Sequence, residues 1–145
     1  MHLTNNEHKF YFKKKGDISG QSFEGDFTVK CVLNIEEQVQ VGILVDRYNA
    51  GSRTLDPNRA LMNRSIAELE MRIVKDKEEK FLCPTWWTES DFGRTLYDYN
   101  ILYSVFSQAM DAEKDWKDRI NKEVKKAEKD VKKSNKIRAD REKKK

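Results

Sequence analysis

Two histidines, two cysteines and several adjacent carboxylates are the side chains of this sequence that could do chemistry. His2 and His8 lie near the N-terminus, and neither has a partner at a spacing typical of a catalytic triad or a metal site. Cys31 and Cys83 could form at most one disulfide, and we expect two buried thiols instead. The acidic pair at residues 36–37 is adjacent in sequence, which favours solvated side chains over two acids aimed at one substrate.

The glycines bear on nucleotide binding. None of the six glycines belongs to a glycine-rich loop that could hold phosphate groups. Together with the histidine and carboxylate positions, this predicts a protein that is not an enzyme. We therefore expect no catalytic residue, no cofactor and no metal site.

Charge and hydrophobicity are unevenly distributed along the chain. Charged residues make up 37% of the sequence, against roughly one quarter in most globular domains. Residues 111–145 hold 15 Lys and Arg against 9 Asp and Glu, a balance of +6, whereas residues 1–110 hold 14 against 16, a balance of −2. No run of about 18 apolar residues and no signal peptide are present, so we expect cytoplasmic synthesis and no membrane partner.

The first elements should form a β-hairpin. Residues 10–12 (Phe-Tyr-Phe), followed by three lysines and a glycine, predict a short strand that ends in a turn. Residues 22–33 alternate with period two, which places one set of side chains inward: Phe23, Gly25, Phe27, Val29, Cys31 and Leu33. An isolated hairpin is marginal in water, so its apolar face must pack on helices. Residues 1–9 are predicted to be a flexible arm.

Two capping signals predict the helices that follow. Asn34 and Glu37 can form a capping box, and Gly51 can end this helix. The residues expected to face the core are Ile35, Val39, Ile43 and Tyr48. Asp56-Pro57 should begin a second helix that runs to about Val74, with residues 52–55 as a connector. Its inward residues should be Met62, Ile66, Leu69 and Ile73, and its solvent-facing residues Arg59, Asn63, Glu70 and Arg72.

The stretch from Phe81 to Met110 holds the longest apolar pattern and should organise the core. After a charged loop at residues 75–80, a third helix should start near Thr88, Ser90 or Asp91 and continue to Val131, a length of ~60 Å. Its apolar stripe is expected at Leu96, Tyr99, Tyr103, Phe106, Met110, Trp116, Ile120, Val124, Ala127 and Val131. Asn100 should be partly buried and bonded to a loop backbone.

Aromatic side chains of this stretch are the candidate site. The Trp86-Trp87 corner fits a core position, and it also fits an apolar anchor for a partner protein. The predicted partner-binding residues are Trp86, Trp87, Tyr99, Tyr103, Phe106 and Trp116.

The lysine-rich tail leaves two interpretations open. Lysines could release counterions from nucleic acid. However, acidic residues recur through the tail and no aromatic residue follows Trp116, which favours an exposed charged helix that binds protein. A homo-oligomer formed through this helix, as in a coiled coil, is one expected arrangement, and nucleic-acid binding ranks below it.

Three segments carry a resemblance to a known class of proteins. They are residues 56–73 (Asp-Pro-Asn-Arg-Ala-Leu-Met-Asn-Arg-Ser-Ile-Ala-Glu-Leu-Glu-Met-Arg-Ile), 83–87 (Cys-Pro-Thr-Trp-Trp) and 96–102 (Leu-Tyr-Asp-Tyr-Asn-Ile-Leu). With them the chain, over about residues 25–115, resembles the tail assembly chaperones of long-tailed bacteriophages. The resemblance implies a protein of the host cytoplasm that binds phage tail or capsid proteins during virion assembly. A structural component that stays in the virion is equally compatible.

The expected fold class is α+β. A short N-terminal β-hairpin should pack on a mainly helical domain over residues 10–110. Residues 111–145 should form a charged helical extension with a frayed lysine-rich end.

Overall fold

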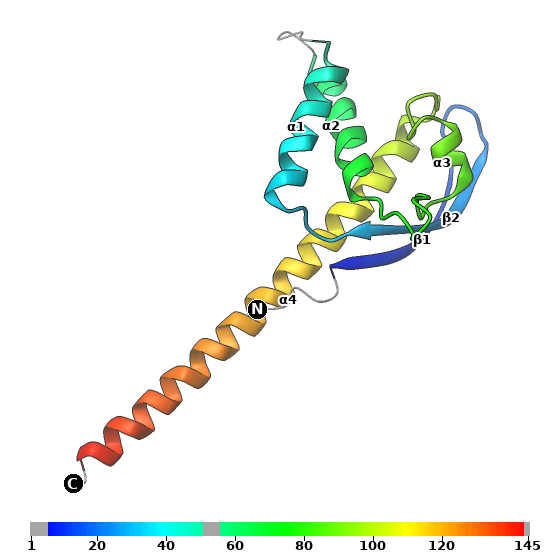
Figure 1. Cartoon of the computed structure of the whole chain (residues 1–145). Helices are drawn as coiled ribbons and strands as arrows, with labels where there is room; N and C mark the ends of the chain where they lie inside the picture. The colour runs from blue at the N-terminus through cyan, green and yellow to red at the C-terminus, as the bar shows by residue number, and fades with distance from the viewer. Residues whose placement is uncertain (1–5, 51–55, 144–145) are drawn as a thin grey trace. The chain divides into compact units, whose positions relative to one another are not determined.

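The structure is a computed structural model that describes residues 6–50 and 56–143. It contains two compact units, Met1–Glu113 and Lys114–Lys145. The α+β class is confirmed, because a two-stranded antiparallel sheet precedes helices of which the last is long (Figure 1). The expected roles of Gly51, of residues 52–55 and of the first five residues lie outside the described residues.

The hairpin consists of β1 (Glu7–Lys15) and β2 (Ser22–Lys30). β1 begins earlier than expected, so the prediction that residues 7–9 are flexible is wrong. The cause is an anchor at the open end of the hairpin, where the Asn6 side chain bonds to both the N–H (2.8 Å) and the C=O (3.1 Å) of Val32. The predicted inward face is confirmed, with these side chains buried: Phe23, Phe27, Val29, Cys31 and Leu33.

A further chain segment covers the other edge of β2. The Val74 N–H donates to the Thr28 carbonyl at 2.9 Å, and the Thr28 N–H donates to the Leu82 carbonyl at 3.0 Å. The charged residues 75–80 form the turn between these contacts, which agrees with the expected exposed loop. An open strand edge would invite pairing with another chain, and this segment occupies part of that edge.

Helix α1 (Ile35–Tyr48) has the predicted capping box between Asn34 and Glu37. Its predicted inward face is wrong for three residues, because Ile35, Val39 and Ile43 are 82%, 56% and 46% exposed. The helix carries apolar residues on two sides. The side that packs against α2 is not the one that contains these three residues. The residues of the packed side are Val41, Leu44, Val45 and Tyr48. Of these, Tyr48 was predicted to face the core.

Helix α2 (Pro57–Arg72) starts as predicted, with the Asp56 side chain accepting from the N–H groups of Asn58 and Arg59. Ile66, Leu69 and Ile73 are buried as expected. Arg72 was predicted to face solvent, but it is 4% exposed. Two carboxylates and a backbone carbonyl surround its guanidinium, which is why a charged residue tolerates this position.

The predicted third helix is interrupted. A short α3 (Thr85–Glu89) is followed by turns, and α4 (Tyr99–Lys143) begins later than expected. Asp91, Phe92 and Gly93 have positive φ angles of 54°, 58° and 85°, which a right-handed helix cannot accommodate. Ser90 supports this break, because its hydroxyl accepts from the Gly93 N–H at 3.1 Å.

The buried side of α4 within the first unit also differs from the prediction. Tyr99 is 57% exposed, and Tyr103, Phe106 and Met110 are half-buried. The side chains that are buried occupy neighbouring helical positions: Ile101, Leu102, Val105, Ala109 and Ala112. The polar start of α4 specifies this rotation, because it is bonded to the hairpin turn.

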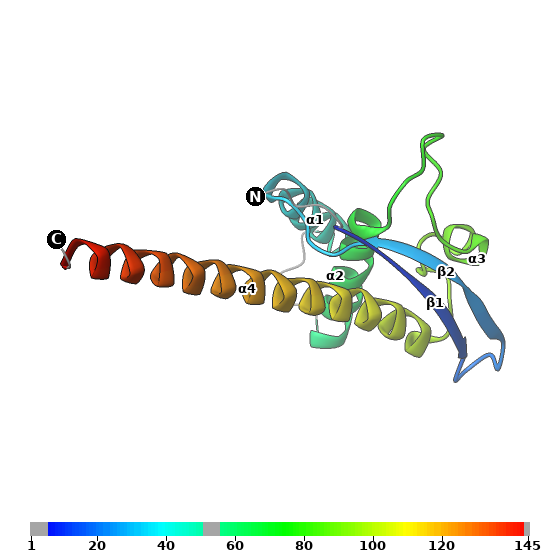
Figure 2. The same ribbon diagram turned by 90° about the horizontal axis from the view of Figure 1, so that it is seen from below.

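Asp98 and Asn100 make those bonds to the hairpin turn. The Asp98 carboxylate accepts from the N–H groups of Ile18 (2.7 Å) and Ser19 (2.8 Å), and from the Ser19 hydroxyl (2.6 Å). Asn100 accepts from the Asp17 N–H and donates to the Lys15 carbonyl, both at 3.1 Å, which confirms its predicted bond to a loop backbone. Figure 2 shows the hairpin turn beside the start of α4.

We expect these bonds to make folding pH-dependent. The hydrogen bonds from the Ser19 hydroxyl and N–H lower the pKa of Asp98. Its stabilising effect is therefore fully present above the ordinary pKa of about 3.9 and is lost as the pH falls through the lower folded-state value. Asp98→Asn should lower the Tm at neutral pH, and its difference from the wild type should shrink as the pH falls below about 4. Thermal unfolding followed by circular dichroism measures this, and a constant difference would contradict it.

Candidate protein-binding site

The two tryptophans of the predicted site lie against the hairpin. Trp87 is fully buried, and its ring centroid lies 5.7 Å from that of Phe27. Trp86 is half-buried, with its ring 5.0 Å from Phe23 and its indole N–H donating to the Glu24 carbonyl at 2.9 Å. These contacts assign Trp87 to the core and make Trp86 a cover over the sheet.

The other predicted residues lie on α4. Tyr99, Tyr103 and Phe106 are spaced by four and three residues, so they share one side of the helix. Because all three keep some exposed surface, a partner could reach this side without rearrangement. Trp116 belongs to the second unit and is 8% exposed.

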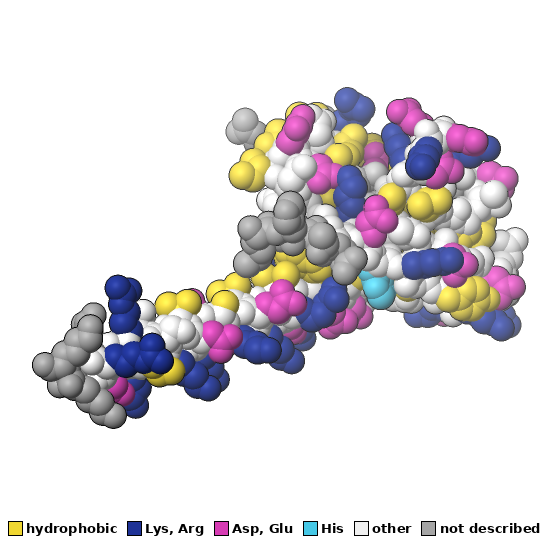
Figure 3. Space-filling model, turned by 60° about the horizontal axis from the view of Figure 1, so that its bottom comes forward, with side chains coloured by type: hydrophobic (Ala, Val, Ile, Leu, Met, Phe, Trp, Pro, Cys, Tyr) yellow, Lys and Arg dark blue, Asp and Glu magenta, His cyan; other side chains and the backbone are white. Residues whose placement is uncertain are grey.

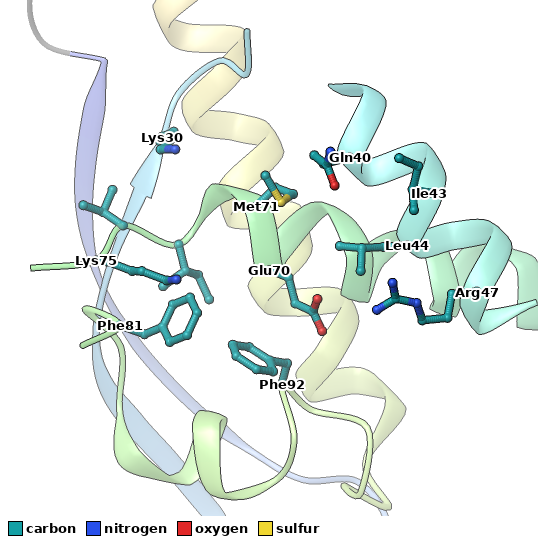
Figure 4. Close-up of a pocket in the computed structure, with 12 residues that line it drawn as sticks. Lys30, Gln40, Ile43, Leu44, Arg47, Glu70, Met71, Lys75, Phe81 and Phe92 are labelled. Carbon is teal, nitrogen blue, oxygen red and sulfur yellow. The ribbon is translucent and has the colours of Figure 1, made fainter. Parts of the chain in front are cut away.

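A groove that sequence reasoning missed lies in the first unit, with a volume of about 750 Å³ (Figure 4). Residues of α1 and the end of α2 form part of its wall, and Lys30 of β2 and residues from two later turns complete it. Its apolar side chains are Ile43, Leu44, Met71, Ile73, Val74, Phe81 and Phe92. Its polar side chains are Lys30, Gln40, Arg47, Glu70 and Lys75.

The charges of the groove are predominantly positive. Lys30, Arg47 and Lys75 line it together with a single carboxylate, that of Glu70, but Lys30 is already paired with Glu37. Arg47 and Lys75 therefore carry the positive charge that a ligand could meet. Glu70 accepts a hydrogen bond from the Tyr48 hydroxyl. Burial and this hydrogen bond raise the pKa of Tyr48 to about 12, so the phenol stays protonated and continues to donate at neutral pH. The remaining charge of the groove therefore suits an apolar ligand that also carries carboxylates.

An exposed apolar row leads along α1 into this groove. Ile35, Val39 and Ile43 follow one another at intervals of four residues, and Ile43 also lines the groove. Exposed aliphatic side chains that are contiguous with an apolar cavity are typical of a protein contact. We call this surface, the row together with the groove, the α1 surface. In the sequence, this surface is indicated by the apolar spacing of Ile35, Val39 and Ile43, the same spacing that predicts a core-facing side.

The helix of the second unit separates its side chains by type. Ile120, Val124, Ala127 and Val131 share one side, which we call the seam. Within residues 120–136, Glu123, Glu128 and Asp130 border the seam, whereas the opposite arc is basic. That arc contains Lys122, Lys125, Lys126, Lys129, Lys132, Lys133 and Lys136. Figure 3 shows lysine and arginine side chains along this helix together with hydrophobic ones.

The residues that could do chemistry are dispersed. His8 lies exposed in β1, and His2 is outside the described residues. Both cysteines are thiols, but only Cys31 is buried as expected, whereas Cys83 is half-buried. Partial burial raises the pKa of Cys83 to about 11, which keeps it protonated at neutral pH. Among the described residues, no group of three or more His, Cys, Asp or Glu could hold a metal ion.

Searches of protein families, curated proteins and solved structures find no match for the chain. Within residues 6–50 and 56–143, no helix has the length and apolar content needed to cross a membrane.

We expect Trp87→Ala to lower the free energy of unfolding by about 3–5 kcal/mol, because it leaves a cavity among packed aromatic rings. Tyr99→Ala serves as the control, since its side chain is 57% exposed and its loss should cost less than about 1 kcal/mol. Urea unfolding followed by far-ultraviolet circular dichroism compares the two variants with the wild type. If both variants lost the same free energy of unfolding, Trp87 would not be a core residue.

Proposed function

We propose that the protein acts without catalysis, as an assembly protein of a tailed bacteriophage similar to the tail assembly chaperones. The observation that carries this proposal is the α1 surface, an apolar row that continues into a groove. A helix of a partner protein could place its own apolar residues there, as in other helix-in-groove complexes. The partners we propose are phage tail or capsid proteins in the host cytoplasm.

The exposure of the row supports a contact rather than a core role. Ile35, Val39 and Ile43 cover two turns of α1, and their spacing gives a row about 12 Å long. Burying such side chains contributes about 25 cal/mol per Å² of apolar surface, so a partner that covers them gains substantially. A capsid or tail component that stays in the virion would use the same surface, and we retain this as the alternative.

We expect the double variant Val39→Asp/Ile43→Asp to lose at least tenfold in affinity for its partner, because charge would have to be buried in the contact. The measurement is co-purification after co-expression with individual phage tail and capsid proteins. Leu61→Asp is a matched control, since Leu61 is 47% exposed but lies on α2 outside the α1 surface. Both variants should keep the circular dichroism spectrum of the wild type. Equal retention of a partner by the double variant and the control would contradict the proposal.

The basic arc of the second unit favours nucleic-acid binding as a second candidate function. Its lysines lie on one side of the helix, while the nearby acids border the seam. An arc of this kind could follow a phosphate backbone without reading its sequence.

This second function predicts a steep salt dependence. If about five phosphates are contacted, affinity for a short DNA duplex should fall roughly 500-fold between about 50 and 200 mM salt. Lys125→Glu/Lys129→Glu/Lys132→Glu should weaken binding and reduce the slope of log K against log salt. Fluorescence anisotropy measures both. Binding that is absent at low salt, or unaffected by the triple variant, would exclude this role for the arc.

A further inference from the structure

We propose that the groove of one copy of the chain binds the seam of a second copy, so that copies associate head to tail. This inference rests on the proposed function, because it names a partner for the α1 surface. Two surfaces of complementary charge, both with apolar side chains, carry it, one in each unit of the chain.

The groove requires an apolar ligand with negative charge at its borders. More than half of its lining residues are apolar, among them Leu44, Met71 and Phe92. Arg47 and Lys75 bring positive charge from different elements, α1 and the turn after α2 (Figure 4). Lys75 lies over the Phe81 ring at 4.9 Å, which places its ammonium group at the wall of the groove.

The seam meets these requirements. Ile120, Val124, Ala127 and Val131 span about 17 Å, compared with about 12 Å for the apolar row of α1. Val131 is 58% exposed. Glu123, Glu128 and Asp130 border the seam, so a helix docked in the groove would bring them toward Arg47 and Lys75, while the basic arc would face away.

A coiled coil between two seams is less favourable on charge. Ile120, Val124, Ala127 and Val131 fit the apolar positions of a heptad repeat. In a parallel pair, the flanking position of Glu123 faces that of Glu128 in the partner helix, so two carboxylates would meet. In an antiparallel pair, the flanking positions of Glu123 and Asp130 would face the same positions of the partner helix, so carboxylates would again meet. This argues against the homo-oligomer that we expected from helix pairing and favours a cationic acceptor for the seam.

The charges of the two units also favour their association between copies. Residues 1–113 hold 14 Lys and Arg against 18 Asp and Glu, whereas residues 114–145 hold 15 against 7. Attraction between oppositely charged units speeds their encounter, although salt screens it. A contact between two different surfaces is not closed by pairing two copies, so it generates rings or open chains.

Charge exchange on the full-length protein tests this contact. Light scattering after size-exclusion chromatography, from about 5 to 500 μM, should show the wild type growing in mass with concentration. Arg47→Glu/Lys75→Glu and, separately, Glu123→Lys/Glu128→Lys/Asp130→Lys should each weaken association at least tenfold. The protein that combines both sets of changes should recover association, because the charges are again opposite. Lys125→Glu/Lys132→Glu, on the basic arc, should associate as the wild type does.

A wild type that stays monomeric at every concentration would overturn the inference. Undiminished association of either charge-reversal variant would also overturn it. So would a combined variant that does not recover association. Circular dichroism of each variant verifies folding. The co-purification experiment uses a different partner and different substitutions, so a phage protein could still bind the α1 surface if self-association fails.

Discussion

The buried guanidinium of Arg72 is the interaction on which the first unit depends most. It donates to Glu68 at 3.0 Å, to the Cys31 carbonyl at 3.0 Å and to Glu113 at 3.1 Å. These partners come from α2, from the chain just after β2, and from α4. A buried charge is costly unless several partners compensate it, so this cation is satisfied only when the three segments are assembled together. The position of the hairpin relative to both helices is thereby coupled to one side chain.

Asp98 fixes the hairpin at its other end. The Asn6 and Arg72 bonds hold the residues around β2's end, while Asp98 holds the turn between the strands. The aromatic cluster of Trp86 and Trp87 packs against Phe27 of the sheet. Helix α1 uses its Val41 side to pack on α2, and its other apolar side remains exposed. The α1 surface is thus presented by a well-anchored scaffold, which lowers the entropy cost of binding a partner.

Local signals in the sequence predicted local structure well. Asn34 and Glu37 predicted the start of α1, Asp56-Pro57 that of α2, and period-two alternation the buried face of β2. Features that depend on distant contacts could not be predicted in this way. The positive φ angles that separate α3 from α4 follow from packing, and the burial of Arg72 requires partners from three segments. The groove could not be predicted from the sequence either, because the residues that line it come together only in the folded chain.

The arrangement of charge in the second unit is more informative than its total. A net excess of lysine alone would favour a polyanion as partner. Along residues 120–136, however, the acids border the apolar seam, and the lysines gather on the opposite arc. One side of this helix therefore has the chemistry of a protein contact and the other that of an anion contact. Because the two sides point in different directions, a seam held in a groove would leave the basic arc in solvent, so protein binding and nucleic-acid binding need not compete.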